Sequence, residues 1–352
     1  MTKLPFRWLC LLVFVLPLGL FAQASYTPPT ITTQFCFPNM DRMSFLRTHA
    51  IEDEGWHNLP QVKFWNKIIK AEPEISYVNI AYNRWLVDSL PTSYFDNLER
   101  IAQRNYKEKM RDEQGLPNGT QLYVTSGKRD YYQLESTLSS IDTAIKIFRR
   151  NEVDPWYAQS ILLIESPGKL RTSYAGAHGP FQLMPFVARM QGLVVNRRLD
   201  ERSDLRKSAE AAAKFIRSTC IVETKNMLSR RGISFEENSL WFRLMVLHVY
   251  HAGAGNVAGA LSSIHAQEGG INLITQLWHA EYNGFGNAAQ NYSQVALAAL
   301  VELEDILSRK CMQDFPRIRT IFPDPIDHIK LPQLSSILPQ QAFDHYYTEL
   351  NW

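Results

Sequence analysis

The stretch "ILLIESPGKLRTSYAGAHGPFQLMP", residues 161–185, runs four apolar residues directly into a carboxylate, Glu165. Four consecutive apolar residues cover most of the circumference of a helix, so this helix end is expected to be buried. Burial disfavours the charged form of a carboxylate and raises its pKa. A carboxyl group that stays protonated near neutral pH is suited to donate a proton to a leaving oxygen. The spacing alone also fits a surface glutamate at a helix C-terminus.

A loop of small residues follows this helix. Gly176 and Gly179 allow close approach of the backbone, and the chain then carries Gln182 and Met184 into an apolar segment. An amide that simply begins the next helix is the structural alternative for Gln182.

A second glycine-rich elbow, "VYHAGAGNV" at residues 249–257, follows another apolar helix. It places Tyr250 and His251 at its mouth. A helix cap and a turn explain the glycines. They do not explain the two polar aromatic residues beside them.

Several blocks occur in one order along residues 131–310. They are Glu165–Ser166, "GPFQLMP" (179–185), "DERSD" (200–204), "SAEAA" (208–212), "VYHAGAGNV" (249–257) and Tyr292 in "NYSQVALAAL". Together they resemble the lysozyme-like lytic transglycosylases of the cell wall, of the soluble-transglycosylase type. Among these, the membrane-bound lytic murein transglycosylase D group is the most similar.

The chain departs from that family at a few positions of these blocks. His251 stands where the family usually has Asn, Pro180 replaces a common apolar residue, and His178 replaces a common small one. The segment "SPGKL" also differs from the usual pattern after Glu-Ser. The departures indicate a changed cleft lining, or a protein that has lost turnover and kept binding.

The resemblance implies cleavage of the β-1,4 bond between N-acetylmuramic acid and N-acetylglucosamine in peptidoglycan. Ordinary glycosidases use two carboxylates, whereas this family is known for using one Glu. Glu165 would then act first as acid and afterwards as base toward the muramoyl C6 hydroxyl, giving a 1,6-anhydro sugar. Asp200, Glu201 and Asp204 fit a structural loop around Arg202 better than a second catalytic role.

The remaining site residues take their expected roles from the same resemblance. Ser166 would bond the carboxylate or a substrate amide, and Tyr292 would orient Glu165. Gln182 and Tyr250 would line the subsites, and His251 and Met184 would belong to the substrate-binding wall. A goose-type lysozyme that uses water, and a non-catalytic peptidoglycan-binding protein, remain as alternatives.

No cofactor and no metal are expected. His248 and His251 are three residues apart and His178 lies in a neighbouring block, but a core histidine with a subsite histidine is the favoured interpretation. A set of N-terminal aromatic residues could stack on sugars, although packing in a helical core is favoured for them. They are Trp56, Trp65, Tyr77, Tyr82 and Trp85.

The predicted fold is mainly α, a lysozyme-like helical catalytic domain with an N-terminal helical accessory region. The predicted division is a signal peptide at 1–24, the accessory region at 25–130, the transglycosylase domain at 131–310 and a Pro-rich extension at 311–352. Apolar periodicity predicts helices within 59–111, including one over "ISYVNIAYNRWLVDSL" (75–90), and a lone strand at "QLYV" (121–124). It predicts further helices over 131–150, 154–166, 203–228, 239–253 and 287–307.

The first 24 residues have the pattern of an export signal. Lys3 and Arg7 precede a short apolar run, and "AQA" supplies small residues for cleavage. We therefore expect export to the periplasm or cell envelope, with peptidoglycan strands as the partner and any protein partner unknown. Removing the two basic residues of the signal leaves 35 basic and 35 acidic residues, a balance that does not suggest nucleic acid.

Three cysteines remain after the signal, and three cannot all pair within one chain. Cys220 and Cys311 each end a predicted helix and form the favoured disulfide. Cys36 would then stay free.

Overall fold

The computed structural model describes residues 31–36, 42–167, 172–314 and 349–350. The protein is mainly helical, as predicted. The predicted signal peptide and most of the predicted C-terminal extension lie outside the described residues. No helix within the described ranges combines the length and the apolar character needed to cross a bilayer.

The helices after residue 131 form the larger part of the molecule. They are α5 (Leu138–Arg150), α6 (Trp156–Glu165), α7 (Pro185–Met190), α8 (Leu205–Phe215), α9 (Ile221–Arg230), α10 (Leu240–Ala252), α11 (Ala254–Ser262), α12 (Ile271–Leu277) and α13 (Asn287–Asp314). Short 3-10 turns cover Leu134–Thr137 and Glu201–Ser203. Each of the five helices predicted in this part is present; α7, α11 and α12 were not predicted.

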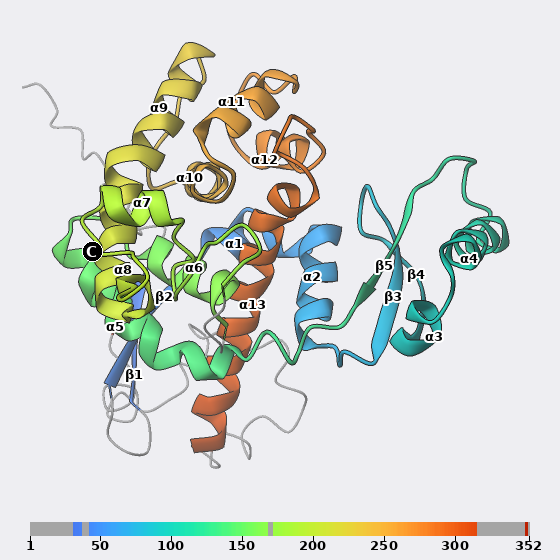
Figure 1. Ribbon diagram of the computed structural model, residues 1–352, viewed down its shortest axis with the longest axis horizontal. Coiled ribbons are helices and arrows are strands. Elements are labelled where there is room, and N and C mark those ends of the chain that lie inside the picture. Colours follow the sequence, from blue (N-terminus) through green and yellow to red (C-terminus); the bar gives the residue numbers. More distant parts are fainter. Residues whose placement is uncertain (1–30, 37–41, 168–171, 315–348, 351–352) are drawn as a thin grey trace, which may run out of the picture.

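Helix α13 runs through the middle of the molecule, with α6 on one side and α2 (Pro60–Lys70) on the other (Figure 1). Nine of the ten residues of α6 are buried, all except Glu165. Asp154, two residues before α6, accepts a hydrogen bond from the Trp156 backbone N–H at 2.9 Å. The sequence therefore forms a helix that is buried on every side and carries one carboxylate at its end.

The N-terminal segment adds two antiparallel sheets. One has the order β2-β1-β6, from β1 (Ile31–Cys36), β2 (Arg42–Arg47) and β6 (Glu349–Leu350). The other has the order β4-β3-β5, from β3 (Ile75–Ile80), β4 (Leu86–Pro91) and β5 (Leu122–Ser126). The remaining elements are α1 (Ala50–Asp53), a 3-10 turn (Trp56–Asn58), α3 (Thr92–Asp96) and α4 (Arg100–Glu113).

The helix predicted over residues 75–90 is wrong, because this segment is the β3–β4 hairpin. Its β-branched and aromatic residues favour a pleated strand, and the "AYNR" segment supplies the turn. The strand predicted at 121–124 is present as β5, but it pairs with β3 and is not alone. Residues 31–36, which precede the predicted helices, form β1, and β1 pairs with β2.

Two hydrophobic cores divide the molecule differently from the predicted boundary at residue 130. Helix α2 contributes Phe64 and Trp65 to the main core, together with the helices after residue 131. A separate small core lies between the second sheet and α3 and α4, and it consists of Val78, Leu90, Phe95, Met110 and Leu122. Helix α2 therefore packs with the catalytic helices, and the hairpin sheet with α3 and α4 projects beyond it (Figure 1).

The predicted disulfide between Cys220 and Cys311 is wrong. Cys220 is a free thiol with no exposed surface. It does not end a helix, because α8 continues through a π-helical turn (Ile216–Cys220) into α9. Burial directs the thiol into the core, where it packs as a small apolar group. The side chains of Cys36 and Cys311 lie outside the described residues.

Candidate active site

Glu165 is the last residue of α6, and its carboxyl group is largely enclosed by protein. Desolvation raises the pKa of Glu165 to about 7, although the hydrogen bond from Tyr292 opposes this rise. The Tyr292 hydroxyl donates to Glu165 Oε1 at 2.8 Å from α13. The contact expected between Tyr292 and the acid is thus present, and the carboxyl group can hold a proton near neutral pH.

Three further tyrosines surround the end of α6. The charge of Glu165 raises the pKa of Tyr132 and Tyr250, after the larger effect of burial. The Tyr131 hydroxyl donates to the Glu165 backbone carbonyl at 3.3 Å. Sequence reasoning missed Tyr131 and Tyr132. The adjacent pair of tyrosines at the start of a predicted helix was the only signal for them.

The loop that follows α6 is tied together at one carbonyl. Ser166 Oγ donates to the Gly179 carbonyl at 3.3 Å, and Gln182 Nε2 donates to the same oxygen at 2.9 Å. The Tyr250 hydroxyl donates to the Phe181 carbonyl at 2.6 Å. The structure therefore brings Ser166, Gln182 and Tyr250 to one short loop. The hydroxyl of Ser166 bonds this loop and not the Glu165 carboxylate, the first of its two predicted partners. Its contact with a substrate amide stays a prediction.

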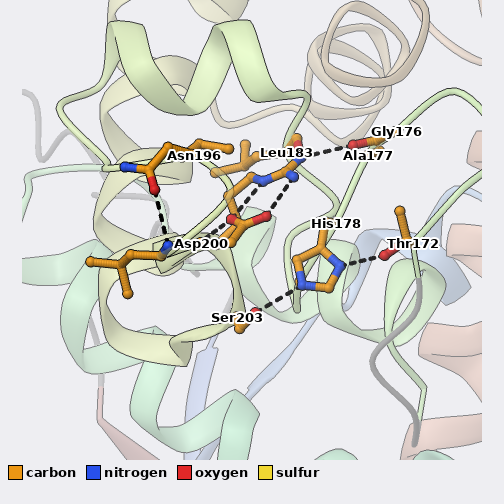
Figure 2. A network of polar contacts seen from close by, with 12 residues as sticks. Thr172, Gly176, Ala177, His178, Leu183, Asn196, Asp200 and Ser203 are labelled. Carbon is orange, nitrogen blue, oxygen red and sulfur yellow. Dashed lines mark hydrogen bonds and ion pairs between the residues drawn. The ribbon is translucent and has the colours of Figure 1, made fainter.

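Arg202 also holds this loop. Its guanidinium forms two bonds with Asp200, from Nε at 2.9 Å and from Nη2 at 2.7 Å. Nη1 donates to the carbonyls of Gly176 and Leu183, each at 2.8 Å. Figure 2 shows Asp200, Gly176 and Leu183 converging in this network. The "DERSD" block thus acts as the structural loop that its composition predicted.

His178 joins the same network between two hydroxyl groups. Its Nδ1 lies 2.7 Å from Thr172 Oγ1, and its Nε2 lies 2.8 Å from Ser203 Oγ (Figure 2). Gly179 next to it has φ +82°, and an added Cβ would collide with the Arg202 carbonyl oxygen. Only glycine fits this close approach.

His251 and His248 have different surroundings although they share α10. His251 is exposed and stacks on Tyr292, with ring centroids 4.2 Å apart. His248 is buried, and its Nε2 lies 2.8 Å from Ser293 Oγ. Desolvation lowers the pKa of His248 to about 3. Among the described residues, no three His, Cys, Asp or Glu side chains gather as a metal site would require.

Met184 lies at the start of α7 with 40% of its surface exposed, while the neighbouring Phe181 is fully buried. Met184 is therefore available as a wall residue, and Phe181 belongs to the core.

Residues 142–271 match the family model of the Transglycosylase SLT domain. No curated protein and no solved structure matches the chain. The match includes Glu165, the Gly179–Pro185 block and the elbow with Tyr250 and His251. Tyr292 lies beyond it.

The matched segment is thus a lysozyme-like transglycosylase domain. This family consists of lytic transglycosylases, and the protein is accordingly an enzyme of that class, a lyase that acts on the glycan strands of peptidoglycan.

Proposed function

We propose that the protein cleaves the β-1,4 bond between N-acetylmuramic acid and N-acetylglucosamine and forms a 1,6-anhydromuramoyl end. Glu165 is the single acid and then the base of this reaction. The export signal predicted from the sequence supports a periplasmic or envelope location. The chain's order of motif blocks supports a place near the membrane-bound type D group.

One observation carries this proposal: Glu165 ends a buried helix with its carboxyl group bonded to Tyr292, and this burial raises its pKa to about 7. An acid with a pKa near the working pH can both donate and accept a proton within one cycle. No second carboxylate of the described residues is among the groups that shift this pKa. The nearby acids are engaged elsewhere, because Asp200 bonds Arg202 and Glu201 pairs with Lys207.

The proposed reaction proceeds in two proton transfers. Protonated Glu165 gives its proton to the glycosidic oxygen as the bond from that oxygen to C1 breaks. The resulting carboxylate takes the proton of the muramoyl C6 hydroxyl while the C6 oxygen bonds to C1. No water is consumed, and Glu165 ends the cycle protonated as it began. The hydrogen bond from Tyr292 would stabilise the carboxylate formed between the two steps.

The loop around Gly179 and the elbow of α10 and α11 would bind the sugars. Gln182 lies on this loop, Tyr250 of α10 bonds it at the Phe181 carbonyl, and His251 presents an exposed ring beside Tyr292. An exposed ring that is already stacked on one face can receive a sugar or an acetamido group on its edge. We assign the substrate-binding role to these residues, with Met184 on the wall.

Mass spectrometry of digested sacculi tests this function. The wild-type protein should release fragments lighter by one water than hydrolytic products. Glu165→Gln should lower the rate by about a thousandfold or more, because it removes the general acid. Glu304→Gln is the matched control: desolvation also raises the pKa of Glu304 to about 7, but Glu304 lies against Arg47.

Products with free reducing ends would show a goose-type hydrolase instead. Full activity of Glu165→Gln would exclude Glu165 as the acid.

A further inference from the structure

A cavity of about 610 Å³ lies outside the catalytic loop, between α2 and the β3–β4 hairpin. Its lining residues come from the start of α2 and from the hairpin: Asn58, Pro60, Lys63, Phe64, Lys67, Arg84, Trp85 and Leu86. A second cavity of about 400 Å³ shares Lys63 and Lys67 and continues along α2 to Lys70. Figure 1 shows α2 and the hairpin side by side. The two cavities therefore form one groove along α2.

The charge of the larger cavity is entirely positive. Lys63 and Lys67 are exposed, and they lie one turn apart on the same face of α2. None of the eight lining residues is acidic. Within the described part of the chain, no carboxylate forms an ion pair with Lys63, Lys67 or Arg84. Lys70, at the far end of the groove, is paired with Glu302.

Arg84 brings a third cation to the cavity from the tip of the hairpin. It is 6% exposed, and its guanidinium donates to the amide oxygens of Asn79, Asn287 and Asn291. Its backbone has φ +60°, a left-handed conformation that is strained for a residue with a long side chain. Amide oxygens satisfy its donors, and its guanidinium lies over the rings of Phe64, Trp65 and Tyr123, 5.8, 5.8 and 4.9 Å from their centroids. No carboxylate of the described chain neutralises its charge.

Two aromatic residues flank Arg84 at this tip. Trp85 is 63% exposed and forms part of the cavity wall. Tyr82 is 67% exposed and stacks on His279 of the catalytic part, with ring centroids 3.8 Å apart. The packing predicted for the N-terminal aromatic residues holds for Trp56 and Trp65, which are buried, but not for these two.

The cavity is connected to the catalytic acid through α13. Asn291 accepts the hydrogen bond of Arg84 at 2.8 Å, and the next residue, Tyr292, donates to Glu165. The hairpin tip and the catalytic acid thus contact consecutive residues of α13, the helix that packs against both α2 and α6.

We propose that this cavity binds the peptide attached to the glycan strand, through the free carboxylates of that peptide, and so makes acidic peptide substitution a determinant of substrate choice. The proposal rests on the proposed function, since peptidoglycan joins peptides to the strand that Glu165 would cleave. Lys63, Lys67 and Arg84 attract the carboxylates, and Trp85 offers a flat face to the aliphatic part of the peptide.

Binding to the Glu165→Gln protein separates this inference from turnover. Isothermal titration would use three probes: a glycan with acidic peptides, the same glycan with its peptide carboxylates amidated, and a glycan without peptides. We expect the acidic form to bind about tenfold more tightly than either of the others at low salt, with the difference shrinking as salt rises.

Lys63→Gln combined with Lys67→Gln should abolish that tenfold preference and leave binding of the peptide-free glycan unchanged. Arg100→Gln combined with Arg104→Gln is the matched control. It removes two exposed cations at the same spacing from α4, which do not line the cavity. The control should keep the preference.

Equal affinity of the parent protein for acidic and amidated glycans would overturn the inference. Retention of the preference in the double lysine variant would overturn it as well. Either result leaves the proposed cleavage intact, because turnover and product mass are measured on the active protein. Conversely, if the active protein formed no anhydro products, the proposed cleavage would be refuted. The affinities measured on the Glu165→Gln protein would still test the peptide site.

Discussion

Two buried arginines show how differently this chain uses the same side chain. Arg202 and Arg84 are each 6% exposed. Arg202 meets the carboxylate of Asp200 with two hydrogen bonds and closes the catalytic loop. Arg84 lies at the tip of a hairpin beside a cavity, and within the described chain its guanidinium donates to the amide oxygens of three asparagines. Burial lowers the pKa of Arg84, as expected for a cation without a carboxylate beside it.

The difference teaches that burial alone does not define the role of a charged residue. A cation with an internal carboxylate is neutralised, and it serves the structure. A cation held by neutral amides and aromatic rings keeps its net positive charge, and its electric field extends into the adjoining cavity. Both residues are arginines, so the groups that surround each one decide whether it serves the structure or binds a ligand.

The largest expected effect on stability comes from removing Arg202, the clamp of the catalytic loop. Arg202→Met leaves Asp200 without its partner and deprives the Gly176 and Leu183 carbonyls of a donor. We expect a loss of about 3 kcal/mol in the free energy of unfolding. Arg84→Met should cost only about 1 kcal/mol, because no carboxylate is left behind. Denaturant unfolding of both variants measures the gap, and equal losses would remove the distinction drawn between the two arginines.

A smaller effect on stability is expected at Gly179, which packs against the backbone carbonyl of Arg202. Gly179→Ala must both adopt a positive φ and displace the Arg202 carbonyl, so we expect a cost of about 2 kcal/mol. Gly176→Ala keeps the strain of φ +90° but meets no atom within 4 Å, and it should cost about 1 kcal/mol. Thermal unfolding of the two alanine variants compares them directly. A more stable Gly179→Ala than Gly176→Ala would mean that the loop is not tightly held.

The smallest expected effect concerns α13, where the two regions meet. Tyr292→Phe removes the hydrogen bond that lowers the pKa of Glu165, so this pKa should rise further above its ordinary value. The acid form then persists to higher pH, and the alkaline limb of the pH–rate profile should move upward by about one pH unit.

Tyr250→Phe and Arg84→Met serve as controls for that profile. The Tyr250 hydroxyl bonds the Phe181 carbonyl, and Arg84 bonds Asn291, so neither removes a bond to Glu165. Both should leave the alkaline limb in place. If the alkaline limb of Tyr292→Phe moved to lower pH, Tyr292 would not be lowering the pKa of Glu165.

The spacing of apolar residues along the chain was sufficient to predict the catalytic helices. The apolar run before Glu165 predicted a buried helix with an acid at its end, and the structure places Glu165 there with a raised pKa. It failed at residues 75–90, where apolar residues at helical spacing formed a hairpin instead. Short apolar runs satisfy both periods, and the pairing of β3 with β5 decides between them.

The sequence by itself determined the acid, the glycine loops and the clamp composition, because each depends on residues close together in the chain. Only the tertiary structure decided which groups surround them. Tyr292 reaches Glu165 across 127 positions, and Arg84 reaches Asn291 across 207. Cys220 stays unpaired because its helix turns it into the core. Such contacts depend on how whole elements pack, and no short stretch of sequence carries that information.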